Sequence, residues 1–209
     1  KRMDSKLKNI FKIILMIVSL QIIRIAVRRV LLLFIPITEL SLNILNMVIF
    51  IIYTYLLVKY CKKNKIDLRV FKVNNKNAYL LLISIFIILF IINLLLNKFS
   101  MNNIFKILYG TITLPIFEEL LFRGYIWSRL LKMFKNEMYV YIITTLLFSI
   151  YSVFYIDSAI LLKVFSFGLI IFKLVIGLLF GLITGFVRYK TKNTFSSMIV
   201  SSIMNMVSK

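Results

Sequence analysis

Two adjacent glutamates and an arginine stand inside a strongly apolar stretch, residues 115–124 (PIFEELLFRG). A charge in hydrocarbon costs about 2.5–3.5 kcal/mol on insertion scales, so such residues usually have a function. On a helix Glu119 and Arg123 share a face, whereas Glu118 points about 100° away from Glu119. We expect Arg123 to hold Glu119. Glu118 would then face a cavity, where it could act as a general base on water.

The apolar surroundings of these charges extend over most of the chain. Hydrophobic residues make up 61% of the 209 positions, which is typical of a polytopic membrane protein. The length allows one membrane domain and no separate soluble one. The net charge of +20 does not indicate nucleic-acid binding, because the cations lie between apolar runs and form no face of a soluble fold. The single cysteine, Cys61, cannot form an internal disulfide.

The apolar runs predict an all-α fold, a polytopic membrane helix bundle of about seven transmembrane helices. We expect spans at about 13–37, 40–58, 78–96, 104–131, 138–156, from 174 onward, and 194–207, with a turn at 157–158 and a short interfacial helix before the sixth span. The first run lacks a small-residue cleavage site and is expected to be a true span. Residues 1–105 would supply the N-terminal helices and a basic loop, and residues 106–209 the core, as one continuous domain.

Proline and arginine residues inside the spans also affect the expected site. Pro115 has no backbone N–H, so we expect it to kink the fourth span or open its hydrogen bonds just before the glutamates.

Arg24 and Arg28 share a face of the first span, and their side chains should point into the bundle or toward a headgroup layer. For Arg28 and Arg29, snorkelling toward lipid phosphates is at least as strongly expected.

The distribution of cations predicts the orientation in the membrane. With the N-terminus inside, the inside loops would hold most of the Lys and Arg residues, including all seven between 59 and 77. The outside loops and ends would hold only Lys98, Lys106, Lys163 and Lys209. The positive-inside rule therefore predicts a multi-pass protein of a cell membrane with a cytoplasmic N-terminus. The Lys-, Ile- and Asn-rich composition indicates a bacterial plasma membrane.

A GxxxGxxxG pattern stands in the sixth predicted span, at Gly177, Gly181 and Gly185. Glycines on one helix face let another backbone approach closely. We favour helix packing inside the monomer over dimerisation.

The motif around the glutamates resembles the EExxxR signature of the CPBP family, the CAAX-protease and bacteriocin-processing (Abi) family of membrane endopeptidases. It reads Glu118-Glu119-Leu-Leu-Phe-Arg123 here, after a proline and before Gly124-Tyr125. Later segments are similar in order: Phe148 to Ser152 resembles an FxxxH motif, Gly177 to Thr191 a glycine-rich helix, and Ser201 to Asn205 an HxxxN motif. The resemblance covers residues 106–209.

The resemblance implies a hydrolytic site. In that family the glutamate and the motif histidines activate a water that attacks a peptide carbonyl, and the asparagine stabilises the oxyanion. Carried over by position, Glu118 would be the base, with Glu119 and Arg123 beside it and Asn205 at the oxyanion.

The histidines of that site are missing from this chain. It contains no histidine, and the two motif positions read Ser152 and Ser201. Serine can hold a water but cannot shuttle a proton near neutral pH. No Cys or His lies near the carboxylates in the sequence, so we expect no metal and no cofactor.

Three functions remain open at this stage. A reduced hydrolytic site would use Glu118, Ser152, Ser201 and Asn205, although each lost acid–base partner costs a factor of about 10²–10⁴ in rate. A retired scaffold would instead bind a peptide or membrane-protein partner, as in bacteriocin immunity. A small transporter subunit would use Glu118 and Glu119 as an ion site, but no second acidic span offers a relay partner. We predict the second function, a pseudoprotease, with a glutamate-dependent endopeptidase as the alternative.

Overall fold

The computed structural model describes residues 2–70, 76–96, 100–134 and 136–207, and within these ranges the chain is helical without strands. The α-helices are α1 (Arg2–Leu31), α2 (Glu39–Lys63), α3 (Lys76–Leu96), α4 (Met101–Leu108), α5 (Leu114–Glu119), α6 (Trp127–Leu131), α7 (Glu137–Val153), α8 (Ile156–Leu161), α9 (Phe167–Thr191) and α10 (Thr194–Val207). Two π-helical segments, η1 (Tyr109–Thr113) and η2 (Leu120–Ile126), join α4, α5 and α6. The predicted all-α helix bundle is confirmed.

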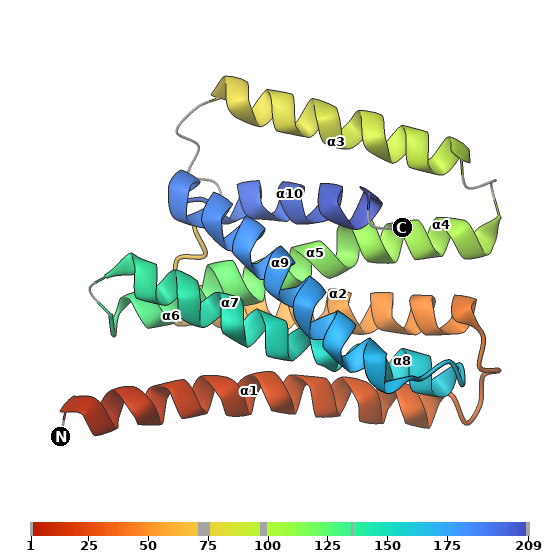
Figure 1. Cartoon of the computed structure of the whole chain (residues 1–209), viewed down its shortest axis with the longest axis horizontal. Coiled ribbons are helices and arrows are strands. Elements are labelled where there is room, and N and C mark those ends of the chain that lie inside the picture. Colours follow the sequence, from red (N-terminus) through yellow and green to blue (C-terminus); the bar gives the residue numbers. More distant parts are fainter. Residues whose placement is uncertain (1, 71–75, 97–99, 135, 208–209) are drawn as a thin grey trace.

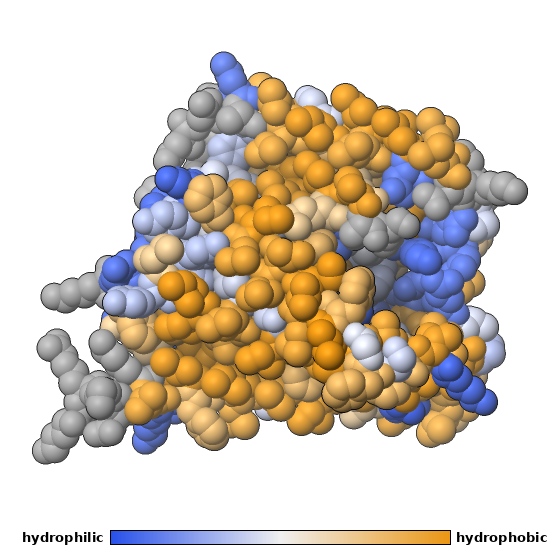
Figure 2. All heavy atoms as spheres, viewed as in Figure 1, coloured by the Kyte–Doolittle hydropathy of each residue, from blue (hydrophilic) through white to orange (hydrophobic). Residues whose placement is uncertain are grey.

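Five helices are long and apolar enough to cross a membrane: Leu7–Leu31, Glu39–Lys63, Tyr79–Leu96, Glu137–Leu161 and Phe167–Thr191. Of the other two predicted spans, the last is the shorter apolar helix α10, and the fourth is the interrupted helix over 101–131. Figure 1 shows the helices running roughly side by side. Figure 2 shows a broad apolar band with hydrophilic residues at both ends of the molecule, as a membrane protein requires.

Some predicted boundaries are wrong. The turn expected at Asp157 and Ser158 is part of α8, and α9 starts at Phe167, seven residues before the predicted start of the sixth span. Lys173 therefore lies inside α9, in its second turn. The basic loop between the second and third predicted spans falls partly outside the described residues, and the C-terminal Lys209 lies wholly outside them.

The helix that carries the glutamates continues from Met101 to Leu131, and its pitch widens twice. In η1 the Leu114 N–H donates to the Tyr109 carbonyl, five residues back. This wider turn precedes Pro115, whose ring would crowd the preceding turn of a regular α-helix. The proline therefore causes a π-turn and not a break, and the second π-segment, η2, contains Arg123.

The core lies between α1, α2, α7 and the glutamate helix. Its largest fully buried side chains include Phe50, Phe117, Phe122 and Trp127, and the Phe50 and Phe117 rings stack with centroids 4.9 Å apart. Helix α3 has a different position: it is the outermost helix at one edge of Figure 1, and its residues from Leu80 to Leu96 are all at least partly exposed. It contacts α10 and α4.

Arg24 and Arg28 are fully buried in a cluster that joins α1 to α2 and α8. Both guanidinium groups pair with Asp157, with Arg24 Nη2 lying 3.0 Å from its carboxylate. Both also donate to the Asn46 side-chain oxygen, at 3.2 and 3.3 Å. The expected snorkelling of Arg28 is wrong, because the carboxylate from α8 binds it inside the bundle, whereas Arg29 is exposed.

The three glycines of α9 face α7 within the same chain. A Cβ atom added at Gly177 would lie 2.2 Å from the Ser152 hydroxyl oxygen and 3.1 Å from the Ser149 Cα. At Gly181 it would lie 3.2 Å from the Thr145 carbonyl oxygen. The absence of side chains thus lets the α7 and α9 backbones approach closely.

Replacing Gly177 with alanine should lower the free energy of unfolding by about 1–3 kcal/mol, because the new methyl group overpacks this contact. The matched control is Gly168→Ala in the same helix, where the nearest atom to an added Cβ is 4.0 Å away. That change should be neutral or stabilising by up to about 1 kcal/mol. Both values can be measured by detergent denaturation, and equal effects of the two changes would contradict the packing argument.

Candidate functional site

Glu119 and Arg123 form an ion pair inside the bundle. Arg123 Nε lies 3.5 Å from Glu119 Oε2, and both side chains are fully buried. The pairing follows from their spacing of four residues on one helix. Arg123 also donates through Nη2 to the Gly181 carbonyl on α9, at 3.0 Å, and its guanidinium lies 4.6 Å from the Phe148 ring centroid.

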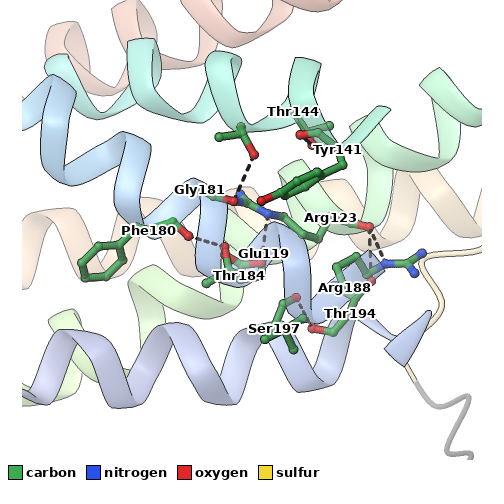
Figure 3. Close-up of polar contacts among 12 residues, drawn as sticks. Glu119, Arg123, Tyr141, Thr144, Phe180, Gly181, Thr184, Arg188, Thr194 and Ser197 are labelled. Carbon is green, nitrogen blue, oxygen red and sulfur yellow. Dashed lines mark hydrogen bonds and ion pairs between the residues drawn. The ribbon is translucent and has the colours of Figure 1, made fainter. Parts of the chain in front are cut away.

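Hydroxyl groups from two further helices surround Glu119. Thr184 of α9 and Ser197 of α10 lie beside its carboxylate (Figure 3). Both hydroxyls donate instead to carbonyls of their own helices, Thr184 to Phe180 and Ser197 to Thr194, each at 2.8 Å. Neither carboxylate oxygen of Glu119 has a hydrogen-bond donor within the described part of the chain. Glu119 is thus held mainly by charge.

Glu118 points to a different part of the bundle. It is 4% exposed, and its Oε1 accepts a hydrogen bond of 2.6 Å from the Tyr155 hydroxyl. The Tyr151 hydroxyl lies 3.1 Å from that of Tyr155. Since Tyr155 has one hydroxyl proton and gives it to the carboxylate, Tyr151 is the donor in the second contact. Two tyrosines of one helix end therefore extend from Glu118 into the core.

This chain of contacts reaches the arginine cluster of α1. The Arg24 guanidinium lies 5.2 Å from the Tyr155 ring centroid, within the range of a cation–π contact. Arg24 also donates to the Phe154 carbonyl, at 2.9 Å. The residues that hold Tyr155 against Glu118 thus come from outside the segment that carries the predicted motifs.

Ser152, at the first motif histidine position, lies in the contact between α7 and α9. Its hydroxyl oxygen is 2.6 Å from the Lys173 carbonyl and 2.7 Å from the Ser149 carbonyl. The side chain also lies against Gly177, at the closest approach of the two helices. Ser152 therefore bonds to backbone and not to Glu118.

Ser201 and Asn205 lie on α10, one turn apart. Ser201 is fully buried, and its hydroxyl makes no hydrogen bond to any of the described residues. Asn205 is half-buried. Across the described ranges, no hydrogen bond joins Ser152, Ser201 or Asn205 to either glutamate. The predicted site residues therefore separate into the Glu119–Arg123 pair, the Glu118–Tyr155 contact and the helix-packing serines.

The sequence interpretation missed Tyr151, Tyr155, Thr184 and Ser197. Tyr151 lies in the last turn of α7 and Tyr155 immediately before α8, and their spacing of four residues could have indicated that they lie close together. Nothing local marks Thr184 or Ser197, because each hydroxyl becomes relevant only where its helix meets Glu119. The helix α9, which corresponds to the sixth predicted span, thus also lines the polar cluster.

A large apolar cavity lies beside this cluster, between α3, α10, the end of α2 and the glutamate helix. Its volume is about 1060 Å³. Ile83 and Phe86 of α3 form one wall, and Ile112, Ile116 and Met198 form others. Glu118 and Glu119 lie outside its lining. The Glu118 carboxylate accepts the hydrogen bond from Tyr155 and is not part of the wall of this cavity.

The chemistry available at the cluster is limited. Glu118 could accept a proton, and Arg123 neutralises Glu119, but among the residues that the structure describes no group beside Glu118 can relay a proton near neutral pH. Among the described residues, no group of three or more His, Cys, Asp or Glu side chains is placed to hold a metal ion.

Comparison with known proteins identifies the family. Residues 100–207, about half of the chain, match the family model described as type II CAAX prenyl endopeptidase Rce1-like. Searches of the curated proteins and of the solved structures found no match. The matched segment contains the EExxxR motif and both serine positions, and it confirms the resemblance to the CPBP family. The chain therefore belongs to the Rce1-like family of CAAX prenyl endopeptidase-type membrane proteins.

Proposed function

We propose that this protein is a pseudoprotease, a family member that binds a peptide or membrane-protein partner without cleaving it. Roles of this kind include bacteriocin self-immunity and scaffolding of another membrane protein. The proposal rests on which motif residues are present. The chain has Glu118, Glu119, Arg123 and Asn205 but neither motif histidine.

The observation that carries the proposal is the position of Ser152. The family's proton-transfer group would stand there, yet the side chain touches Gly177 and bonds to the Lys173 carbonyl. An imidazole at this position would collide with α9. The helix contact has thus closed around a small residue, which supports a site that no longer performs acid–base chemistry.

A second candidate function is a glutamate-dependent endopeptidase. The observation that favours it is the 2.6 Å contact between Tyr155 and Glu118, which orients one carboxylate oxygen. Without a proton relay, each missing partner would lower the rate by a factor of about 10²–10⁴. Efficient turnover would therefore need a group that the described residues do not bring to Glu118.

For the orientation, we propose that the chain crosses a cell membrane several times and that its N-terminus lies on the cytoplasmic side. The support is the concentration of cations in the loop between α2 and α3 and around the start of α10. This end of the bundle, which holds residues 64–70 and 192–194, is called the loop end below.

The test uses a prenylated peptide that ends in a CAAX sequence, added to the full-length protein in liposomes. We expect the peptide to bind without cleavage, as followed by its fluorescence anisotropy and by mass spectrometry. The Glu118→Ala variant should give the same result. The Ser152→His/Ser201→His variant should also lack activity, because Gly177 leaves the first imidazole no room.

Cleavage by the native protein that disappears in Glu118→Ala would overturn the proposal in favour of the endopeptidase. Cleavage gained by the double histidine variant would show that the α7–α9 contact can open, and would contradict the packing argument. A peptide that neither binds nor is cleaved would count against a partner of this chemistry.

A further inference from the structure

The cavity beside α3 combines apolar walls with charge at one end. Along its length it is lined mainly by Ile, Leu, Phe and Met side chains of α3, the glutamate helix and α10. At the loop end the lining includes Lys62, Asp67 and Arg69. The described residues of the rim therefore include two cations and one carboxylate, a net charge that favours an anionic group.

The rim cations are available to a ligand. Lys62 is exposed at the end of α2, and Arg69 is half-buried. Among the described residues, neither side chain forms an ion pair, and Asp67 accepts its hydrogen bond from the Arg69 backbone N–H, at 2.7 Å. A phosphate between Lys62 and Arg69 would thus displace no ion-pair partner that the described residues provide.

The backbone around Arg69 is held in place by α10. The Thr194 N–H donates to the Arg69 carbonyl at 3.0 Å, and the Thr194 hydroxyl donates to the Leu68 carbonyl at 2.7 Å. Arg69 has φ of 50°, a conformation that non-glycine residues rarely adopt. These contacts fix the backbone from which the Arg69 side chain extends toward the cavity, so a ligand would have to order only that side chain.

A third cation lies behind this rim. Arg188 is fully buried and close enough to Arg69 to repel it electrostatically. Its Nε donates to the Arg123 carbonyl at 3.1 Å, while Nη1 and Nη2 have no hydrogen-bond partner among the described residues. In Figure 3 the Arg188 guanidinium points away from Glu119. Its charge adds to the positive potential at the loop end.

The position of the cavity indicates which class of ligand it could bind. Helix α3 forms its outer wall and is itself an apolar membrane helix, in which every residue from Leu80 to Leu96 is at least partly exposed, so the space is bordered by bilayer. The volume of about 1060 Å³ is at the upper end of ligand-site volumes. Basic pockets between membrane helices at the cytoplasmic side are typical sites for anionic lipid headgroups.

From these observations we propose that the cavity is a binding site for one anionic phospholipid. An acyl chain fills the space between α3, the glutamate helix and α10, and the phosphate lies between Lys62 and Arg69. The site does not depend on whether the protein cleaves peptides, and so goes beyond the proposed function.

The test compares phosphatidylglycerol with phosphatidylcholine carrying the same acyl chains. The full-length protein is extracted from bilayers with equal amounts of both, and retained lipid is measured by native mass spectrometry. We expect one phosphatidylglycerol per chain in clear excess. Arg69→Gln and Lys62→Gln should each reduce its retention by about fivefold. The matched control is Lys63→Gln, an exposed lysine beside Lys62 that does not line the cavity.

A second pair of variants tests the apolar part of the site. Ile83→Trp should fill the cavity from α3 and abolish retention, whereas Ile85→Trp, on the exposed face of the same helix, should not. Equal retention of both lipids, loss of lipid in Lys63→Gln to the same extent as in Arg69→Gln, or a co-purified peptide in place of phospholipid would each overturn the proposal. None of these outcomes depends on the cleavage assay.

Discussion

Replacing Asp157 with alanine should lower the free energy of unfolding by about 3–5 kcal/mol, because it leaves Arg24 and Arg28 buried without a carboxylate. Both guanidinium groups are fully buried, and Asp157 is their ion-pair partner. The loss should also loosen α1, since the cluster joins α1 to α2 and α8. Denaturant titration in detergent, followed by the fluorescence of the buried and single Trp127, measures the change.

The matched control for Asp157 is the exposed ion pair between Glu39 and Lys106, whose atoms are 2.7 Å apart. Glu39→Gln should change the free energy of unfolding by less than about 1 kcal/mol, because water screens this pair. If Asp157→Ala were no more harmful than Glu39→Gln, the ion pairs with Asp157 would not stabilise the fold, and α1 would be held by its other contacts, such as the bond from the Tyr53 hydroxyl to the Leu20 carbonyl.

Removing Arg123 should have an effect of similar size. Arg123→Leu leaves the Glu119 carboxylate fully buried with no opposite charge in contact, and breaking such a pair costs about 3–5 kcal/mol. The bond from Arg123 to the Gly181 carbonyl is lost as well, so the contact between the glutamate helix and α9 should weaken. The same fluorescence titration measures this loss.

A double-mutant cycle separates the charge from the packing. Glu119→Leu/Arg123→Leu removes both charges, and replacing a buried pair by apolar residues is often neutral or stabilising. The double variant should therefore be more stable than either single variant. A double variant whose loss equals the sum of the single losses would mean that Glu119 and Arg123 act independently, in conflict with the 3.5 Å contact.

Relations between near neighbours could be predicted from the sequence. Glu119 and Arg123 pair because one turn of helix places them together whatever surrounds that helix. The apolar runs predict helices because a backbone in hydrocarbon must satisfy its own hydrogen bonds. The EExxxR motif, with the serine positions that follow, was enough to indicate the family that the match over residues 100–207 confirms.

Contacts between distant segments could not be predicted in this way. Asp157 meets Arg28 across 129 positions of the chain, and Tyr155 meets Glu118 across 37. Arg28 at the end of an apolar helix could equally reach lipid headgroups, and only the docking of α8 places a carboxylate beside it. Pro115 indicated an irregular helix, but a kink and a π-turn remained equally compatible with the sequence.

The sequence by itself determined that this chain is an all-α membrane protein of the CAAX-protease type with no histidine at its motif positions. Only the tertiary structure decided what the remaining residues do there. Ser152 could have held a water beside Glu118, but the approach of Gly177 places it against the α9 backbone. The physical reason is that the charge and hydrophobicity of a residue follow from its type and can be read from the sequence. The space around its side chain depends instead on which helix packs against it.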